Sequence, residues 1–327
     1  MKEALSYEKK ENNKVRCLLC PHYCLISEGK TGICRGRKNL EGRLFAINYG
    51  QCTSLAIDPI EKKPLYHFHP GSEILSTGPN GCNLACPFCQ NWEISQTEVT
   101  TEFISPENLV DLAKRYHSIG IAYTYSEPLI WYEYLLDVGK IAKENELLNV
   151  LVTNGMINEQ PLRQLLPLVD AMNIDLKSIR ESFYQKICKG DFKTVSRTIE
   201  ICKKACHIEL TNLIIPTLND SEKDLEDLVD WAANLGVETP VHFSRYFPHY
   251  KMSIPATPVQ TLKKAYEIAK AKLRYVYVGN VWLEDTADTY CYNCGALLVS
   301  RSGYYTNVVG ITDGKCTKCE VKAEMVL

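Results

Sequence analysis

From residue 74 onward the chain alternates short apolar runs with longer amphipathic stretches, and this alternation limits the possible folds more than any other feature. Apolar runs of about five residues separated by helical periodicity are typical of βα units that build a parallel sheet. We expect strands at 74–78, 119–124, 149–153, 171–175, 207–214, 241–245 and 275–278, with helices around 106–116, 129–144, 159–166, 194–206, 221–235 and 258–273. The sequence therefore predicts an α/β protein with six or seven βα units.

Length and composition favour one large domain with small additions. The chain has 327 residues, of which 45% are hydrophobic and 23% charged, and its net charge is -2. An α/β barrel can reach ~250 residues as one domain, and a near-neutral chain offers no general attraction to nucleic acid. No apolar run approaches the ~20 residues of a membrane span, and the first residues lack a signal-peptide core. We expect a cytoplasmic enzyme that binds neither membranes nor nucleic acid.

Fifteen cysteines are too many for an ordinary cytoplasmic core, where structural disulfides are rare, so metal binding is expected. Four scattered thiols, Cys52, Cys188, Cys202 and Cys206, are expected to be small buried residues. The other eleven form three groups: Cys17, Cys20, Cys24 and Cys34; Cys82, Cys86 and Cys89; and Cys291, Cys294, Cys316 and Cys319. These groups predict an N-terminal cysteine module over 1–70, a barrel over 71–282 and a C-terminal module over 283–327.

The middle group has the spacing Cys82-x3-Cys86-x2-Cys89 and follows the first expected strand. It would lie on the loop at the carboxyl end of that strand, which is the functional face of a barrel. Three thiolates can hold three irons of a 4Fe–4S cluster and leave the fourth iron without a protein ligand. A structural zinc loop is the alternative that three cysteines alone leave open.

This spacing, with Phe88 directly before the third cysteine, resembles the radical S-adenosylmethionine (SAM) superfamily. The resemblance implies a partial (β/α)6-type barrel and a 4Fe–4S cluster whose open iron chelates SAM. It also implies reductive cleavage of SAM to a 5′-deoxyadenosyl radical, which takes a hydrogen atom from a substrate. A low-potential electron donor of the flavodoxin or ferredoxin type would then be a partner.

Polar residues after the next strands resemble motifs of the glycyl-radical-enzyme (pyruvate formate-lyase) activating enzymes. Those activases carry Gly-Gly-Glu-Pro, Asp-Thr-Asn-Gly and Asp-Leu-Lys where this chain has residues 125–128, 152–155 and 175–177. By resemblance, Ser126 and Glu127 bind the SAM amino group, and Asn154, Asp175 and Lys177 meet its ribose or carboxylate. The chain departs from the activase pattern at Tyr125, Ser126, Val152 and Thr211, so we expect a retained SAM pocket with an altered lining.

A narrower resemblance covers nearly the whole chain. The N-terminal cysteine motif, residues 58–71 and residues 89–96 are similar to the AmmeMemoRadiSam system radical SAM protein. Members of that family are encoded alongside AMMECR-domain and Memo-like proteins, which are therefore possible partners. The resemblance does not supply a substrate.

The outer cysteine groups predict metal sites of two kinds. Cys291-x2-Cys294 and Cys316-x2-Cys319 are typical of a zinc ribbon, so zinc is favoured there over an auxiliary cluster. Cys17, Cys20, Cys24 and Cys34 suit a zinc site or a second cluster about equally, with His22 as a possible substitute ligand. A zinc staple is slightly favoured because the segment is polar and expected to be exposed.

Three further segments attract attention near the expected functional face. Residues 66–70 could line the entrance, residues 245–250 could hold a substrate anion or donate a hydrogen atom, and Gly279 could approach adenine through its backbone. The overall prediction is a radical SAM enzyme acting on a protein or metabolite. Its alternatives are an RNA-modifying enzyme and a non-catalytic zinc-binding scaffold for protein partners.

Overall fold

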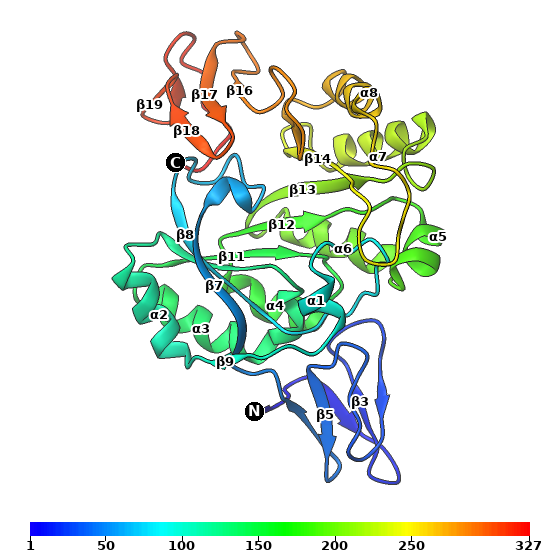
Figure 1. The fold of residues 1–327 in the computed structure, drawn as a ribbon. Coiled ribbons are helices and arrows are strands. Elements are labelled where there is room, and N and C mark those ends of the chain that lie inside the picture. The colour runs from blue at the N-terminus through cyan, green and yellow to red at the C-terminus, as the bar shows by residue number, and fades with distance from the viewer.

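The computed structural model describes all residues 1–327 and is organised around one nine-stranded sheet (Figure 1). Its strand order is β15-β14-β13-β12-β11-β10-β8-β7-β9. Seven neighbouring strands run parallel: β8 (Glu73–Pro79), β10 (Gly120–Tyr123), β11 (Leu148–Thr153), β12 (Ala171–Asp175), β13 (His207–Ile214), β14 (Val241–Arg245) and β15 (Val276–Gly279). The α/β fold with a central parallel sheet is therefore confirmed, with each strand close to its expected place.

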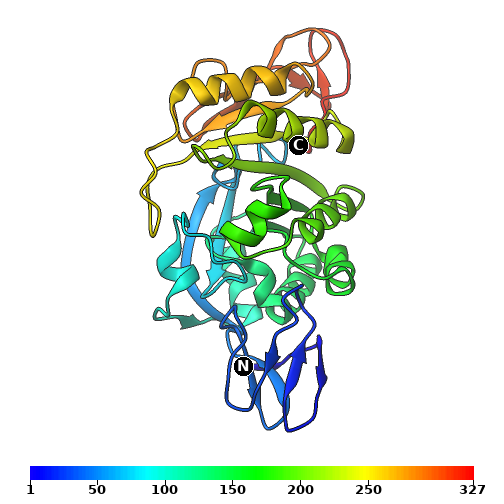
Figure 2. The same cartoon turned by 90° about the vertical axis from the view of Figure 1, so that its right-hand side faces the viewer.

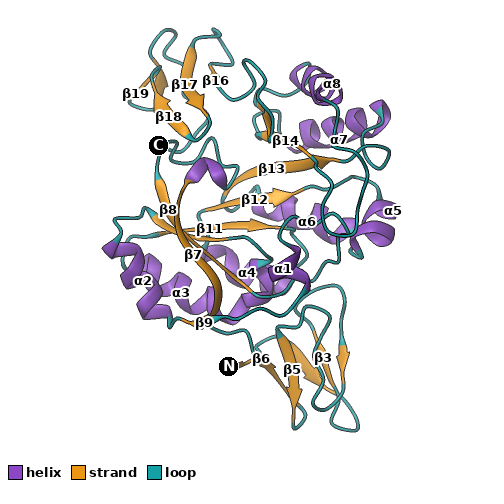
Figure 3. Cartoon of the chain, viewed as in Figure 1, coloured by secondary structure: helices purple, strands orange, loops and turns teal.

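Six helices connect the parallel strands and bury one face each against the sheet (Figure 3). Ser105 and Ser221 cap two of them by accepting a hydrogen bond from the backbone N–H three residues later. The apolar stripes join one core cluster that includes Leu109, Val138 and Val229, all fully buried. The connecting helices are α2 (Pro106–Arg115), α3 (Tyr132–Glu144), α4 (Glu159–Leu165), α6 (Phe192–Cys202), α7 (Glu222–Leu235) and α8 (Val259–Lys270), and two short helices are α1 (Trp92–Gln96) and α5 (Glu181–Phe183). No helix is both long and apolar enough to cross a membrane.

Two antiparallel strands extend the sheet beyond β8. β7 (Gln51–Pro59) pairs with β8, and β9 (Glu102–Phe103) pairs with β7. The sequence divides the chain near residue 70, yet β7 already belongs to the central sheet. The backbone pairing that joins β7 to β8 leaves no alternating pattern in the sequence of this segment.

The two cysteine modules lie at opposite ends of the molecule, beyond the central sheet (Figure 2). The N-terminal part is built from small antiparallel sheets: β1 (Lys2–Glu3), β5 (Arg37–Leu40) and β6 (Arg43–Ala46), and β2 (Tyr7–Lys9), β3 (Val15–Cys17) and β4 (Leu25–Ile26). The C-terminal part contains β16 (Thr289–Tyr290), β17 (Leu297–Ser302) and β18 (Tyr305–Val308), followed by β19 (Ile311–Thr312) and β20 (Lys315–Cys316).

Residues 66–70 do not form an open entrance, because their central part is a buried junction. His67 is fully buried, its ring contacts the Glu324 carbonyl at 2.7 Å, and its backbone N–H donates to buried Glu209 at 2.7 Å. The backbone of Val326 also pairs with this segment. Burial would raise the pKa of Glu209, but hydrogen bonds with His207 and His242 outweigh it and hold that pKa well below its ordinary value. His67 therefore serves packing here, while Tyr66 and His242 line a cavity.

Candidate active site

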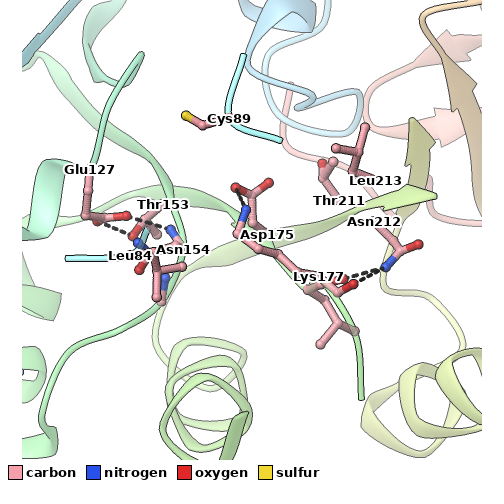
Figure 4. Close-up of polar contacts among 12 residues, drawn as sticks. Leu84, Cys89, Glu127, Thr153, Asn154, Asp175, Lys177, Thr211, Asn212 and Leu213 are labelled. Atoms are coloured by element: carbon pink, nitrogen blue, oxygen red, sulfur yellow. Dashed lines mark hydrogen bonds and ion pairs between the residues drawn. The ribbon is translucent and has the colours of Figure 1, made fainter. Parts of the chain in front are cut away.

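The loops after the parallel strands surround a cavity of about 590 Å3 (Figure 4). Its walls come from the ends of β8, β10, β11, β12 and β13, as expected for the functional face of such a sheet. The predicted cluster ligands and the predicted contacts of the SAM amino group, ribose and carboxylate all line this one cavity: Cys82, Cys86, Cys89, Ser126, Glu127, Asn154, Asp175 and Lys177. The fold thus brings together side chains from four separate loops.

The three central cysteines are held by a loop that the neighbouring structure fixes in place. The Asn80 amide donates to the Ile94 carbonyl at 2.6 Å and to the Thr97 carbonyl at 2.8 Å. The Cys89 sulfur contacts the Ser95 hydroxyl at 3.1 Å, and the Asn154 amide donates to the Cys82 sulfur at 3.6 Å. The loop therefore presents three thiols to one cavity without secondary structure of its own.

The spacing of these sulfurs fits a cluster better than a single ion. Only the C-terminal cysteines bring three or more metal-ligating atoms to within 4.8 Å of one another. Cys82, Cys86 and Cys89 share a cavity but lie farther apart than that. Thiolates on three different irons of a cluster stand farther apart than thiolates on one zinc ion. The residues present can therefore hold a 4Fe–4S cluster with one iron open toward the cavity.

Glu127 connects two strand ends rather than pointing freely into the cavity. Its carboxylate accepts hydrogen bonds from the Leu129 N–H at 2.9 Å, the Thr153 hydroxyl at 2.6 Å and the Asn154 N–H at 2.8 Å (Figure 4). Burial raises its pKa to about 7, although these hydrogen bonds oppose the shift. The Ser126 hydroxyl is also engaged, since it donates to the Pro79 carbonyl at 2.5 Å. Both side chains predicted to meet the SAM amino group are thus already bonded within the protein.

Asp175 and Lys177 place an ion pair in the wall of the cavity, with 2.8 Å between Nζ and Oδ2. Burial would lower the pKa of Lys177, but Asp175 and the nearby thiols Cys86 and Cys188 outweigh it and raise that pKa well above its ordinary value. The Asn212 amide fixes the loop by donating to the carbonyls of Leu176 and Lys177 at 2.7 and 3.2 Å. One cation and one anion are therefore available to a zwitterionic ligand.

A second charged group in the cavity wall was not predicted from the sequence. Asp58 accepts hydrogen bonds from Lys62 at 2.7 Å, from buried Lys63 at 2.6 Å and from the Tyr125 hydroxyl at 2.7 Å. Burial opposes ionisation of Asp58, but these three donors lower its pKa below the ordinary value. In the sequence, only the adjacent lysines at 62 and 63 indicated a charged group here. Tyr125, the third partner of Asp58, is 67 residues away from it.

The segment after β14 closes over the cysteine loop. The Tyr250 ring stacks on Trp92 of α1 with 5.1 Å between centroids, and the Lys251 N–H donates to the Pro87 carbonyl at 2.9 Å. Arg245 donates to the Thr257 carbonyl at 2.9 Å, so its Nε is not free for a substrate anion. Residues 245–251 therefore cover the cysteine loop.

A second cavity of about 860 Å3 adjoins the first and reaches the C-terminal part. The two share Lys62, Gln90, Thr211 and Ser244 in their walls. Gly279 lies here, as do Tyr66, Tyr277 and the exposed Trp282. The site therefore continues from the cysteines toward an aromatic outer chamber.

The C-terminal cysteines form a compact four-sulfur site. The Cys291 and Cys319 sulfurs are 3.6 Å apart, and those of Cys294 and Cys316 are 3.7 Å apart. Tetrahedral ligands with a metal–sulfur distance of ~2.3 Å are separated by roughly 3.8 Å. The four residues can therefore hold one metal ion. Of the four scattered thiols, Cys52, Cys188 and Cys202 are buried, as predicted, whereas Cys206 is only half-buried.

Comparison with known proteins agrees with this geometry. Residues 77–232, which contain the cysteine loop and the strand ends up to β13, match the family model of the radical SAM superfamily. The chain contains a radical SAM superfamily domain. An uncharacterized protein of Methanocaldococcus jannaschii is 45% identical over 336 aligned residues and 100% of both chains. The pyruvate formate-lyase-activating enzyme of Clostridium pasteurianum is 24% identical over 47% of this chain and 67% of its own length.

Solved structures of this superfamily share the fold. A radical SAM methyltransferase from Sphaerobacter thermophilus has a TM-score of 0.51 and 15% identity, over 70% of this chain and 71% of that chain. TYW1 with a lysine-pyruvate adduct bound has a TM-score of 0.50 and 17% identity, over 71% of this chain and 88% of that chain. At these identities the likeness concerns the fold alone.

Proposed function

We propose that this radical SAM protein holds a 4Fe–4S cluster on Cys82, Cys86 and Cys89, cleaves SAM reductively and abstracts a hydrogen atom from a protein or metabolite substrate. The observation that carries the proposal is the shared cavity, where three thiols from one loop face the ends of β10 to β13. When bound, the cluster and SAM would supply a 5′-deoxyadenosyl radical.

The protein's own contribution is orientation and exclusion of water. Lys177 can meet the SAM carboxylate and Asp175 a ribose hydroxyl, because both line the cavity beside the cysteines. Glu127 keeps the Thr153–Asn154 strand end in place, so we assign it a positioning part. Phe88, Val152 and Leu213 supply apolar wall, which suits a reaction that must keep a reactive carbon radical away from water.

The outer chamber is the proposed substrate site. It adjoins the SAM cavity through shared residues, so a substrate there can present a carbon atom to the radical. Tyr66, Tyr277 and Trp282 offer aromatic surface, and Trp282 is 79% exposed at the rim. An exposed rim of this kind suits a segment of a larger molecule as well as a small metabolite.

Partners follow from the same proposal. The reaction needs a low-potential electron donor of the flavodoxin or ferredoxin type. The similarity of residues 58–71 and 89–96 to the AmmeMemoRadiSam system protein supports AMMECR-domain and Memo-like proteins as further partners. Zinc in the C-terminal group is supported by its sulfur spacing.

The test is SAM cleavage by protein purified and reconstituted without oxygen. With dithionite and SAM, wild type should release 5′-deoxyadenosine, whereas Cys86→Ala should release none. Cys52→Ala, which removes a buried thiol outside the cavity, is the matched control and should retain release. Undiminished release by Cys86→Ala would refute the assignment of the site.

A further inference from the structure

The N-terminal cysteines are more buried than expected, although the loops between them are exposed. Expected exposure was the reason for favouring a zinc staple there. Cys17 and Cys34 are buried, at 7% and 9% exposure. All four cysteines line a small enclosed cavity that the barrel completes with Asn83, Leu129, Ile130 and Met156. The module is thus packed against the catalytic domain, and its thiols face inward.

The spacing of these four sulfurs differs from that of the zinc-like C-terminal group. No three of them lie within 4.8 Å of one another, although the C-terminal four do. They also lack the sulfur–sulfur contacts of 3.6 and 3.7 Å that link the C-terminal pairs. Two thiolates on the same metal ion would make such a contact. Four thiols around one cavity, of which no three lie within 4.8 Å of one another, suit the four corners of a cube.

We propose that Cys17, Cys20, Cys24 and Cys34 ligate a second 4Fe–4S cluster, which passes electrons to the cluster site of Cys82, Cys86 and Cys89. His22 is not needed as a ligand, because the four cysteines already supply one thiolate for each iron; its Nε2 contacts the Asn83 carbonyl at 2.6 Å. The four cysteines saturate the cube, which leaves no open iron for chemistry. Electron transfer is the function that such a cluster can perform.

The two sites are separated by little more than one stretch of backbone. Cys82 lines the catalytic cavity, and the next residue, Asn83, lines the N-terminal one. On the other side of Cys82, a Cβ on Gly81 would stand 2.4 Å from the Cys34 carbonyl oxygen, so only glycine permits this approach. Ligands of the two proposed clusters therefore belong to segments in direct contact.

A buried cation faces the N-terminal cavity. Arg37 is 2% exposed, pairs with buried Glu133 at 2.5 Å and lines the cavity, while its Nε has no hydrogen-bond partner. Four thiolates give a 4Fe–4S cluster a net negative charge that grows on reduction. A guanidinium at this place favours the reduced state, which suits a cluster that must accept electrons.

The transfer step rests on the proposed function and balances as a one-electron exchange. The outer cluster goes from the 1+ to the 2+ state, and the catalytic cluster goes from 2+ to 1+. A low-potential protein donor, or dithionite in the assay, returns the outer cluster to the 1+ state. No proton or bond is exchanged between the two sites.

The first experiment counts metals without using activity. We would purify the Cys82→Ala/Cys86→Ala/Cys89→Ala variant anaerobically, reconstitute it with iron and sulfide, and quantify iron, sulfide and zinc. Retention of about four irons and an EPR signal after dithionite reduction is expected. Two zincs and no iron would overturn the cluster. The complementary Cys17→Ser/Cys20→Ser variant should lose about half of the wild-type iron, and loss of none would equally overturn it.

The second experiment tests electron transfer with a donor too large to enter the catalytic cavity. Flavodoxin hydroquinone should reduce the catalytic cluster of wild type at least tenfold faster than that of Cys17→Ser/Cys20→Ser, followed by rapid-freeze EPR. Dithionite should reduce the catalytic cluster of both proteins, which shows that the variant has folded and loaded. Equal rates with flavodoxin would refute the transfer step. Absence of a catalytic cluster in wild type would instead refute the proposed function, and leave the count of outer irons unaffected.

Discussion

Glu127 offers the sharpest test of how the strand ends are held, because it is a buried carboxyl group with a raised pKa. Burial moves its pKa from 4.5 to about 7 in the folded protein. Between these values the unfolded chain has lost the proton and the folded protein still holds it. Stability therefore falls as the pH rises through this window, by ~1.4 kcal/mol for each pH unit and about 3 kcal/mol in total. Above pH 7 this contribution is constant.

The variant Glu127→Gln removes this titration and keeps the shape of the side chain. The glutamine oxygen can still accept from Leu129 and Thr153, while one acceptor facing Asn154 is lost, at a cost of ~1–3 kcal/mol that does not change with pH. Relative to wild type, Glu127→Gln should therefore gain about 3 kcal/mol between pH 4.5 and pH 8. The nearby Asp175 contributes to the raised pKa of Glu127, so SAM must be absent.

The assay is anaerobic urea unfolding followed by circular dichroism at several pH values between 4.5 and 8. Glu107→Gln, in the exposed first turn of α2, serves as the control for a glutamate-to-glutamine change. If the stabilities of wild type and Glu127→Gln ran parallel over the whole range, the buried carboxyl would not titrate as the structure implies. A relative loss of stability by the variant at high pH would contradict the sign of the argument.

Three further predictions concern other parts of the molecule. Gly81→Ala should destabilise the protein by at least about 1–2 kcal/mol in a urea titration, because Gly81 has a φ of 110° and its new Cβ would meet Cys34. The control Gly279→Ala, with no atom within 4 Å of its Cβ, should unfold like wild type. Cys294→Ser should release the C-terminal metal and lower the melting temperature of the protein. Metal analysis and calorimetry measure these two effects, and an unchanged metal content would argue against the four-sulfur site. Asp175→Asn should weaken SAM binding by roughly 10- to 100-fold, because one charge-assisted hydrogen bond is lost. Calorimetric titration of the reconstituted protein measures this affinity, and equal affinity of variant and wild type would show that Asp175 does not contact SAM.

The sequence predicted the parallel strands well because buried parallel strands leave a local signature. Each expected run, such as 171–175, coincides with a strand or differs from it by one or two residues. β7 and β9 escaped prediction because they are defined by their partners in the sheet. The segment 51–59 mixes polar and apolar residues without a clear period, and only its pairing with β8 makes it a strand.

The candidate site shows the same division between local and distant information. The spacing of Cys82, Cys86 and Cys89 was enough to place three thiols in one cavity, since they share a single loop. The group of Asp58, Lys63 and Tyr125 was missed because Tyr125 comes from a segment that meets the other two residues only in the folded protein. Burial of Cys17 and Cys34 was missed for a similar reason: part of the wall of their cavity, formed by Leu129, Ile130 and Met156, belongs to the barrel.

The junction at His67 has a consequence for folding kinetics. Its contact with the Glu324 carbonyl spans 257 residues, and its contact with Tyr277 spans 210. Contacts of such sequence separation form late, because the entropy of closing a long loop must be overcome first. We therefore expect the barrel to assemble first and the C-terminal module to dock in a slow final phase. A molecule caught before that phase would leave the His67 ring without its Glu324 partner, while Glu209 would keep its bonds to His67, His207 and His242.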